Sequence, residues 1–443
     1  MRIGIFGAGY VGLSTAVCFA QKHDITLIDI DPNKVTAINN NKPYIFEKDL
    51  ENLLSHALEK KTLRAKLINE TFPPFHIIFI TVGTPAEDDG YINLQFIRDV
   101  AKTLFHRKTE FFLDDQQTLI VMRSTVIPGT TNRTLGDFEK HELANIVSNP
   151  EFLAQGSAIH DTLHPKRIII GSNQENAFKR LEAFYTQFYL GQQVPILHMS
   201  MESAEFTKYV ANAFLAMKIS FANEIADLVQ HIENTDIDDI MKGIGLDPRI
   251  SPYFLRAGIG FGGSCFPKDI QALISFSENL SAETPRILSA VLKVNENRPY
   301  RLIKILRDKI GDLSGSVIAI LGLSFKPGTN DVRDAPSIGI IQALWRAGAR
   351  IIVHDPLISR IDLRAFKRFN IIVSSSVEEC LRGADACLLL TEWPEYANLE
   401  LDDIVTEMKK KIIIDGRRVF VDRPIPPDVH YITIGSFPNH HLR

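Results

Sequence analysis

A glycine-rich turn near the N-terminus constrains the fold more than any other feature of this sequence. Three glycines in the pattern Gly-x-Gly-x-x-Gly stand at Gly7, Gly9 and Gly12. They separate a short apolar run from a helix-like stretch, and a second apolar run follows at residues 25–28. This order of segments predicts a βαβ unit in which the glycines allow a tight turn between strand and helix.

Further apolar runs of strand length alternate with amphipathic helical segments along the chain. They lie at residues 77–82, 118–122 and 167–170, and again at 317–322, 350–353, 386–390 and 411–414. Between the two groups, long helical periodicity replaces the alternation. The sequence therefore predicts an α/β protein with two Rossmann-like, doubly wound parallel sheets joined by a long-helix middle domain. We place the domains at residues 1–198, 199–310 and 311–443.

The composition is that of an ordinary globular chain large enough for two or three domains: 443 residues, 45% hydrophobic and 23% charged. A net charge of -4 argues against a nucleic-acid or anionic-membrane partner. The four cysteines have neither zinc-site nor disulfide-framework spacing, so we expect no metal and a reducing, cytoplasmic location. No signal peptide and no membrane-length apolar run is evident.

Asp29 extends the glycine pattern to a cofactor. It falls at the end of the second predicted strand, 17 residues after Gly12. A carboxylate there accepts hydrogen bonds from both ribose hydroxyls and repels a 2′-phosphate, which favours NAD over NADP. The alternative is a glycine turn that binds no dinucleotide.

A second glycine cluster leads into a cysteine. Residues 258–263 contain four glycines, and Cys265, Pro267, Lys268 and Asp269 follow at the expected start of a helix. A helix N-terminus and a nearby lysine both favour thiolate, and Asp269 is expected on the same helical face as the sulfur. An isolated cysteine is more often an inert core residue. We assign that role to the remaining cysteines, Cys18, Cys380 and Cys387.

Lys208 and Asn212 are four residues apart on a predicted helix. Their shared face would offer an ammonium and an amide to a developing oxyanion. The alternative is a solvated helix edge.

With these motifs in one order along nearly the whole chain, the sequence resembles the UDP-glucose/GDP-mannose dehydrogenase family of nucleotide-sugar dehydrogenases. The resemblance rests on residues 7–12, 82–85, 124–126, 149–153, 208 with 212, 260–265, 323–326 and 331–333. Residues 154–156, 391–393 and 415–418 are more similar to the branch that uses UDP-glucose than to the GDP-mannose branch.

The resemblance implies an NAD-dependent, four-electron oxidation of UDP-glucose to UDP-glucuronate, which consumes two NAD and one water. Cys265 would carry a thiohemiacetal and then a thioester. Lys208 and a water held by Asp269 would assist removal of the alcohol proton, and Lys208 with Asn212 would stabilise the oxyanion. Glu151 would act as general base in thioester hydrolysis.

The binding residues are also implied by the resemblance. Thr125 would orient the hydrolytic water. The NAD contacts would be Gly7, Gly9, Tyr10, Val11, Gly12, Asp29, Lys34, Val82, Gly83, Thr84, Pro85, Ser124, Thr125, Val126, Gln155 and Arg333. The nucleotide-sugar contacts would be Glu151, Phe152, Leu153, Lys208, Asn212, Phe254, Arg256, Gly260, Phe261, Gly262, Phe325, Lys326 and Arg417, with Arg249 from the partner in a homodimer or higher oligomer. Lys34, Arg249 and Arg256 also fit the description of ordinary surface charges.

Two departures from the family pattern accompany this resemblance. Gln155 stands where the family often has glutamate, and residues 46–48 read Phe-Glu-Lys, which we expect to change a peripheral helix start more than the chemistry. Other functions remain open: the same chemistry on GDP-mannose or a UDP-N-acetylhexosamine, and a catalytically silent NAD-binding homologue. A hydroxyacid dehydrogenase with two Rossmann domains would leave the cysteine loop unexplained.

Overall fold

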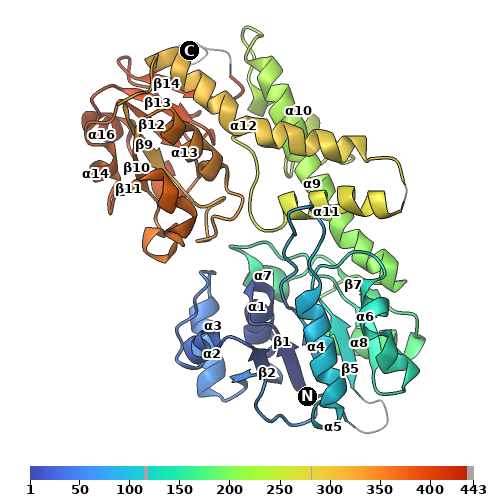
Figure 1. The fold of residues 1–443 in the computed structure, drawn as a ribbon. Coiled ribbons are helices and arrows are strands. Elements are labelled where there is room, and N and C mark those ends of the chain that lie inside the picture. The colour runs from blue at the N-terminus through green and yellow to red at the C-terminus, as the bar shows by residue number, and fades with distance from the viewer. Residues whose placement is uncertain (114–117, 281, 437–443) are drawn as a thin grey trace. The chain divides into compact units, whose positions relative to one another are not determined.

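The computed structural model describes residues 1–113, 118–280 and 282–436, and these divide into two compact units, Met1–Ala211 and Asn212–Arg443 (Figure 1). The longest helix, α9 (Met201–Val229), begins in the first unit and ends in the second.

The first unit is built on an eight-stranded sheet with the order β3-β2-β1-β4-β5-β6-β7-β8. All neighbouring strands are parallel except β6 and β7, which pair antiparallel. The strands are β1 (Arg2–Phe6), β2 (Asp24–Asp29), β3 (Leu63–Leu67), β4 (Ile77–Ile80), β5 (Leu119–Met122), β6 (Asn145–Ser148), β7 (Ile168–Gly171) and β8 (Ile196–Met199). The helices are α1 (Tyr10–Phe19), α2 (Pro32–Asn39), α3 (Leu50–Glu59), α4 (Gln95–His106), α5 (Lys108–Phe111), α6 (Thr130–Lys140), α7 (Ala158–Leu163) and α8 (Glu175–Phe188).

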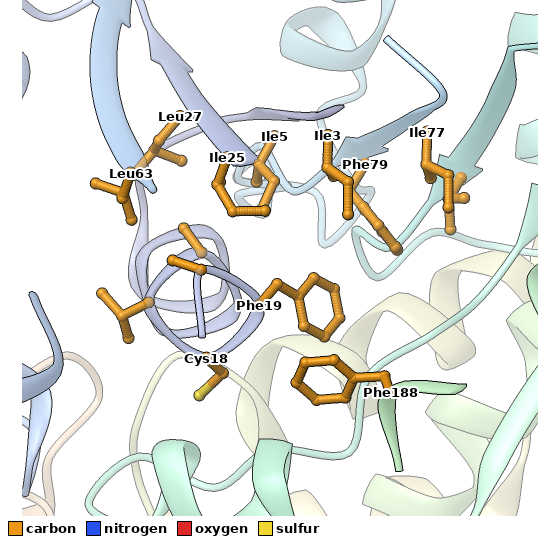
Figure 2. Close-up of a cluster of buried hydrophobic side chains, with 14 of the residues drawn as sticks. Ile3, Ile5, Cys18, Phe19, Ile25, Leu27, Leu63, Ile77, Phe79 and Phe188 are labelled. Carbon is orange, nitrogen blue, oxygen red and sulfur yellow. The ribbon is translucent and has the colours of Figure 1, made fainter. Parts of the chain in front are cut away.

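Both faces of this sheet are buried. On one face, Ile3, Ile5 and Phe79 point toward α1, and the ring of Phe19 faces that of Phe188 with centroids 4.9 Å apart (Figure 2). A second cluster, which includes Phe6 of β1, covers the other face under α4 and α6. Strands that are buried on both sides explain why the sequence shows continuous apolar runs.

The second unit contains a six-stranded, all-parallel sheet with the order β11-β10-β9-β12-β13-β14. Its strands are β9 (Val317–Leu321), β10 (Arg350–His354), β11 (Ile372–Val373), β12 (Ala386–Leu389), β13 (Ile412–Asp415) and β14 (His430–Thr433). Its helices, after the end of α9, are α10 (Ile237–Gly245), α11 (Phe266–Asn279), α12 (Arg286–Ile310), α13 (Pro336–Arg346), α14 (Val377–Leu381), α15 (Pro394–Ala397) and α16 (Leu401–Thr406), with short 3-10 segments η1 (Ile358–Arg360) and η2 (Leu363–Phe369).

The predicted fold class is confirmed: the chain forms two doubly wound α/β sheets, and a region of long helices lies between them in the sequence. The antiparallel β6–β7 pair departs from a purely parallel first sheet. The sequence pattern did not predict strands β3, β6, β8, β11 and β14. Strand β3 reads Leu-Arg-Ala-Lys-Leu, so its charged residues obscure the apolar run, and β8 and β11 are partly exposed edge strands.

Candidate active site

The glycine turn has the geometry that its sequence predicts. Gly7 follows β1 with a φ of 101°, and a Cβ there would lie 2.8 Å from the backbone of Val82. A Cβ on Gly12 would lie 1.8 Å from the carbonyl oxygen of Gly7. These two glycines therefore allow α1 to begin directly after the turn.

Gly9 differs from the other two glycines of the turn. It is the N-cap of α1, and among the described residues no atom beyond its chain neighbours and its own helix lies within 4 Å of where its Cβ would be. The N-terminus of α1 is thus open to close approach by a ligand. Because a pyrophosphate binds at such a helix N-terminus, the turn fits a dinucleotide.

Asp29 ends β2 beside this turn. Its two carboxylate oxygens accept hydrogen bonds from the backbone N–H groups of Ala8 (2.7 Å) and Asp31 (2.9 Å), and the Lys34 ammonium lies 3.6 Å away. Since each carboxylate oxygen has two lone pairs, these contacts leave acceptor capacity for ribose hydroxyls. The Lys34 side chain is 35% exposed and contacts Asp29, so Lys34 lies at the edge of this site.

The loops after β4 and β5 complete the same edge of the first sheet. The Ser124 hydroxyl donates to the carbonyl of Val82 at 2.7 Å, and the Thr84 hydroxyl donates to the carbonyl of Thr125 at 2.9 Å. The structure thus cross-links two of the predicted NAD-binding segments, 82–85 and 124–126. They lie at the carboxyl ends of adjacent parallel strands, where ligands bind in doubly wound sheets.

Glu47 joins this site although the sequence analysis assigned it no role. Its carboxylate accepts N–H bonds from Gly156 and Ala158, each at 2.8 Å, and the Tyr10 hydroxyl accepts a further bond from Gly156. Glu47 therefore fixes the turn that follows Gln155 and the start of α7. The sequence could not reveal this role of Glu47, because a tertiary hydrogen bond leaves no local signal in the sequence.

A buried ion pair lies in the first unit, where Glu151 follows the carboxyl end of β6. The Lys208 ammonium on α9 is 3.4 Å from a carboxylate oxygen of Glu151, and both side chains are less than a tenth exposed. The Phe152 ring lies near two cations, with its centroid 5.4 Å from the Lys208 nitrogen and 3.9 Å from the Arg167 guanidinium. Lys208 is thus no solvated helix edge, and the alternative considered for it is wrong.

The second unit brings three of the predicted catalytic residues together. Cys265 is the N-cap of α11, and its carbonyl accepts the Asp269 N–H at 2.8 Å. The Asp269 carboxylate is 1% exposed and accepts hydrogen bonds from Asn212 and Lys268, each at 2.6 Å. The predicted cysteine at a helix N-terminus, beside an aspartate and a lysine, is present, and Asn212 is buried with them.

The other cysteines have the environment of core residues. Burial raises the pKa of Cys18 and of Cys380 to about 12 and holds that of Cys387 well above its usual value. Thiols of this kind are inert.

The predicted nucleotide-binding residues of the second unit fall into two groups. Arg417 is 13% exposed and donates to the carbonyls of Gly260, Leu390 and Phe325, so it connects the glycine loop to the sheet. A Cβ on Gly263 would lie 2.8 Å from the ring of Phe325. The second group is exposed and consists of Phe254, Arg249, Arg256 and Arg333. Arg249 pairs with Asp247, and Arg333 pairs with Asp331.

The described residues are those of the ranges 1–113, 118–280 and 282–436. They contain no group of three or more His, Cys, Asp or Glu side chains placed to hold a metal ion. No helix in those ranges is both long and apolar enough to cross a membrane.

Comparison with known proteins agrees with this geometry. Three models of the UDP-glucose/GDP-mannose dehydrogenase family match the chain: the NAD-binding domain at residues 1–189, the central domain at 202–297 and the UDP-binding domain at 319–422. The UDP-glucose 6-dehydrogenase YwqF of Bacillus subtilis is 38% identical over 98% of both chains, and that of Pseudomonas aeruginosa is 37% identical over 95% of this chain and 94% of its own.

A solved structure of a UDP-glucose dehydrogenase from Pyrobaculum islandicum matches with a TM-score of 0.83 and 33% identity over 98% of this chain and 97% of its own. The fold, the glycine turn beside Asp29 and the buried cluster around Cys265 define an NAD-dependent dehydrogenase. More closely, the chain belongs to the UDP-glucose/GDP-mannose dehydrogenase family, and it is a nucleotide-sugar dehydrogenase with NAD as its cofactor.

Proposed function

We propose that this dehydrogenase oxidises UDP-glucose to UDP-glucuronate through a covalent adduct of Cys265. The observation that carries the covalent step is the arrangement of Cys265 at the N-terminus of α11, one turn before the buried Asp269. The names of the relatives that are 36–38% identical over nearly the full chain support UDP-glucose as the substrate.

In the first half-reaction, we assign proton removal from the sugar's C6 hydroxyl to Lys208 and a water held by Asp269. NAD, when bound, accepts a hydride from the sugar carbon in each of two oxidations. The glycine turn and Asp29 hold the cofactor, because the open N-terminus of α1 and the lone pairs of Asp29 fit its pyrophosphate and ribose.

In the second half-reaction, the Cys265 thiolate adds to the aldehyde carbon. A C–S bond forms, and the carbonyl oxygen takes the electron pair as an oxyanion, which the Lys208 ammonium and the Asn212 amide stabilise. After the second oxidation the adduct is a thioester. Glu151 takes a proton from the attacking water, which Thr125 orients, and cleavage of the C–S bond returns the thiol and leaves the carboxylate.

The remaining assignments are part of the same proposal. Residues 1–198 would bind NAD, 199–310 would form the middle domain, and 311–443 would bind the UDP-sugar. We also propose a cytoplasmic enzyme, since a catalytic cysteine stays reduced in a reducing compartment.

We further propose that the enzyme is a homodimer or higher oligomer assembled through α9. Exposed apolar side chains recur along this helix at Phe206, Val210, Phe214, Phe221 and Leu228. A contiguous exposed apolar stripe of this length is typical of a protein interface. Sedimentation of Phe214→Asp and of the wild type tests the assignment: the variant should dissociate, and an unchanged oligomeric state would contradict it.

The reaction is tested by counting NADH formed per sugar consumed, in parallel assays with UDP-glucose, GDP-mannose and UDP-N-acetylglucosamine. Two NADH per UDP-glucose are expected, and Cys265→Ser should not complete turnover, whereas the matched control Cys18→Ala should. Two NADH per molecule of a different sugar would replace the substrate and keep the chemistry. A solved UDP-D-ManNAc dehydrogenase from Pyrococcus horikoshii, 26% identical with a TM-score of 0.84, makes a UDP-N-acetylhexosamine the alternative to include. No turnover with any sugar would favour a silent homologue.

A further inference from the structure

The glycine loop that precedes Cys265 is held by hydrogen bonds along its backbone. The Gly258 N–H donates to the Asn223 side-chain oxygen at 2.8 Å, and the Gly258 carbonyl accepts from the Arg298 guanidinium at 3.0 Å. Further along, the Ile259 N–H donates to the carbonyl of Gly416 at 3.1 Å. All of these groups belong to the second unit.

Asn295, on α12, makes two hydrogen bonds to a single residue of this loop. Its side-chain oxygen accepts the Phe261 N–H at 2.8 Å, and its side-chain nitrogen donates to the Phe261 carbonyl at 2.9 Å. One amide thus satisfies both backbone groups of one residue, as a neighbouring β-strand would. Such a pairing fixes the peptide planes on both sides of Phe261, four residues before Cys265.

The contact between Asn295 and Phe261 requires a glycine at the residue before Phe261. Gly260 has a φ of 100°, and a Cβ there would lie 2.5 Å from the Asn295 side-chain oxygen. Gly260 therefore provides both the left-handed conformation and the space into which the amide fits.

We propose that Asn295 is a positioning residue for the nucleotide-sugar site: its amide holds the backbone of residues 260–262 in the conformation that receives the substrate and leads into Cys265. This role rests on the proposed function, because that function places the substrate against the same loop. Asn295 itself touches no reacting atom; it acts through Phe261.

The next turn of α12 anchors this arrangement. Arg298 is almost fully buried, and its guanidinium donates to an Asp227 carboxylate oxygen at 2.7 Å as well as to Gly258. Removing this charge would leave Asp227 and the loop carbonyl with fewer partners and would destabilise the unit, so Arg298 is a poor probe. Asn295 is the better one, because it is neutral and only partly buried.

The test compares Asn295→Ala with the matched control Asn297→Ala. Asn297 is on the same helix, is exposed, and its amide donates to the Lys293 carbonyl one turn earlier. Loss of two loop hydrogen bonds should raise the KM for the nucleotide sugar that the wild type oxidises about tenfold. The KM for NAD should stay within twofold, since the glycine turn and Asp29 lie in the first unit. A merely structural role would reduce the active fraction without changing KM.

Two readouts need no turnover and therefore separate this proposal from the proposed function. The dissociation constant of UDP should rise in Asn295→Ala, and the rate of Cys265 alkylation by iodoacetamide should change severalfold. The buried thiols of Cys18, Cys380 and Cys387 contribute little to that rate. Asn295→Asp keeps the acceptor but faces the Phe261 carbonyl with a second oxygen, so it should not restore affinity. Unchanged KM, UDP affinity and alkylation in Asn295→Ala would overturn the proposal, whatever sugar the wild type oxidises.

Discussion

The two sheets of this protein contain the same turn but use it differently. Gly7 after β1 has a φ of 101° and donates its N–H to Ile28, the residue before Asp29. Gly322 after β9 has a φ of 102° and donates its N–H to His354, the residue before Asp355. Each sheet therefore has a left-handed glycine after its first strand and an aspartate at the carboxyl end of its second strand.

The two aspartates differ in how many hydrogen bonds each carboxylate accepts from the protein. Asp29 accepts two backbone N–H groups and remains slightly exposed. Asp355 is completely buried and accepts the N–H groups of Leu323, Ser324 and Leu357, the Ser324 hydroxyl and the Trp393 indole N–H. A turn of this kind is therefore no dinucleotide site by itself; it becomes one when the carboxylate keeps free lone pairs and a helix begins directly after the glycines.

Asp355→Ala tests the buried half of this comparison and should have the largest effect. It leaves several buried donors without an acceptor, so we expect the free energy of unfolding of the second unit to fall by about 3–5 kcal/mol. Both tryptophans, Trp345 and Trp393, lie in this unit, so urea unfolding followed by tryptophan fluorescence reports on it selectively. The matched variant Asp29→Ala should leave that transition unchanged. A loss below about 1 kcal/mol in Asp355→Ala would show that the buried carboxylate is not needed for the turn.

Glu205 is the least exposed carboxylate in the described part of the first unit, and it should make that unit pH-sensitive. It accepts hydrogen bonds from the Gly129 N–H, the Thr131 N–H and the Thr131 hydroxyl, at 2.5 to 2.7 Å, and burial raises its pKa to about 7. The folded state therefore binds the proton more tightly than the unfolded chain does. Stability is greatest below the unfolded-state pKa near 4.5 and falls by up to about 3 kcal/mol as pH rises to about 7.

Hydrogen exchange at α6, corrected for the intrinsic pH dependence of exchange, measures this slope. Glu205→Gln should flatten it, because the amide does not ionise. The variant should also be less stable at low pH, since its NH₂ group would face a backbone donor. A slope that is equal in wild type and variant would assign the pH response to another group. His23 is not that group, because burial lowers its pKa to about 4 and its contribution to stability therefore rises with pH.

Asp29→Ala tests the open half of the comparison. Loss of two charge-assisted hydrogen bonds to ribose should weaken NAD binding by about 1.5–3 kcal/mol, which is roughly a 10- to 150-fold rise in KM. The KM for the nucleotide sugar and the tryptophan transition should not change. Equal losses in NAD affinity from Asp29→Ala and Asp355→Ala would contradict the distinction drawn here.

The sequence revealed local features better than tertiary ones. The βαβ unit, Asp29 and the position of Cys265 at a helix start were predictable, because glycine spacing, apolar runs and proline act over a few residues. Glu47, Glu205 and Asn295 were not, since each contacts backbone that is 34 or more positions away. Arg417 was predicted as a cation for the diphosphate, and the structure adds that three carbonyls already accept its hydrogen bonds.

Gly9→Ala should have the smallest effect and separates the two requirements that the glycine turn combines. Among the described residues, nothing outside its chain neighbours and its own helix lies within 4 Å of the added Cβ, so the first unit should keep its stability to within about 1 kcal/mol. The methyl would instead occupy the space through which a pyrophosphate approaches, and we expect a rise of a few-fold in the KM for NAD. Gly12→Ala is the contrasting variant, because its Cβ would collide with the Gly7 carbonyl and should destabilise the turn itself. If Gly9→Ala binds NAD as the wild type does, the open space beside Gly9 is not where the cofactor lies, and Asp29 would be the main determinant of binding.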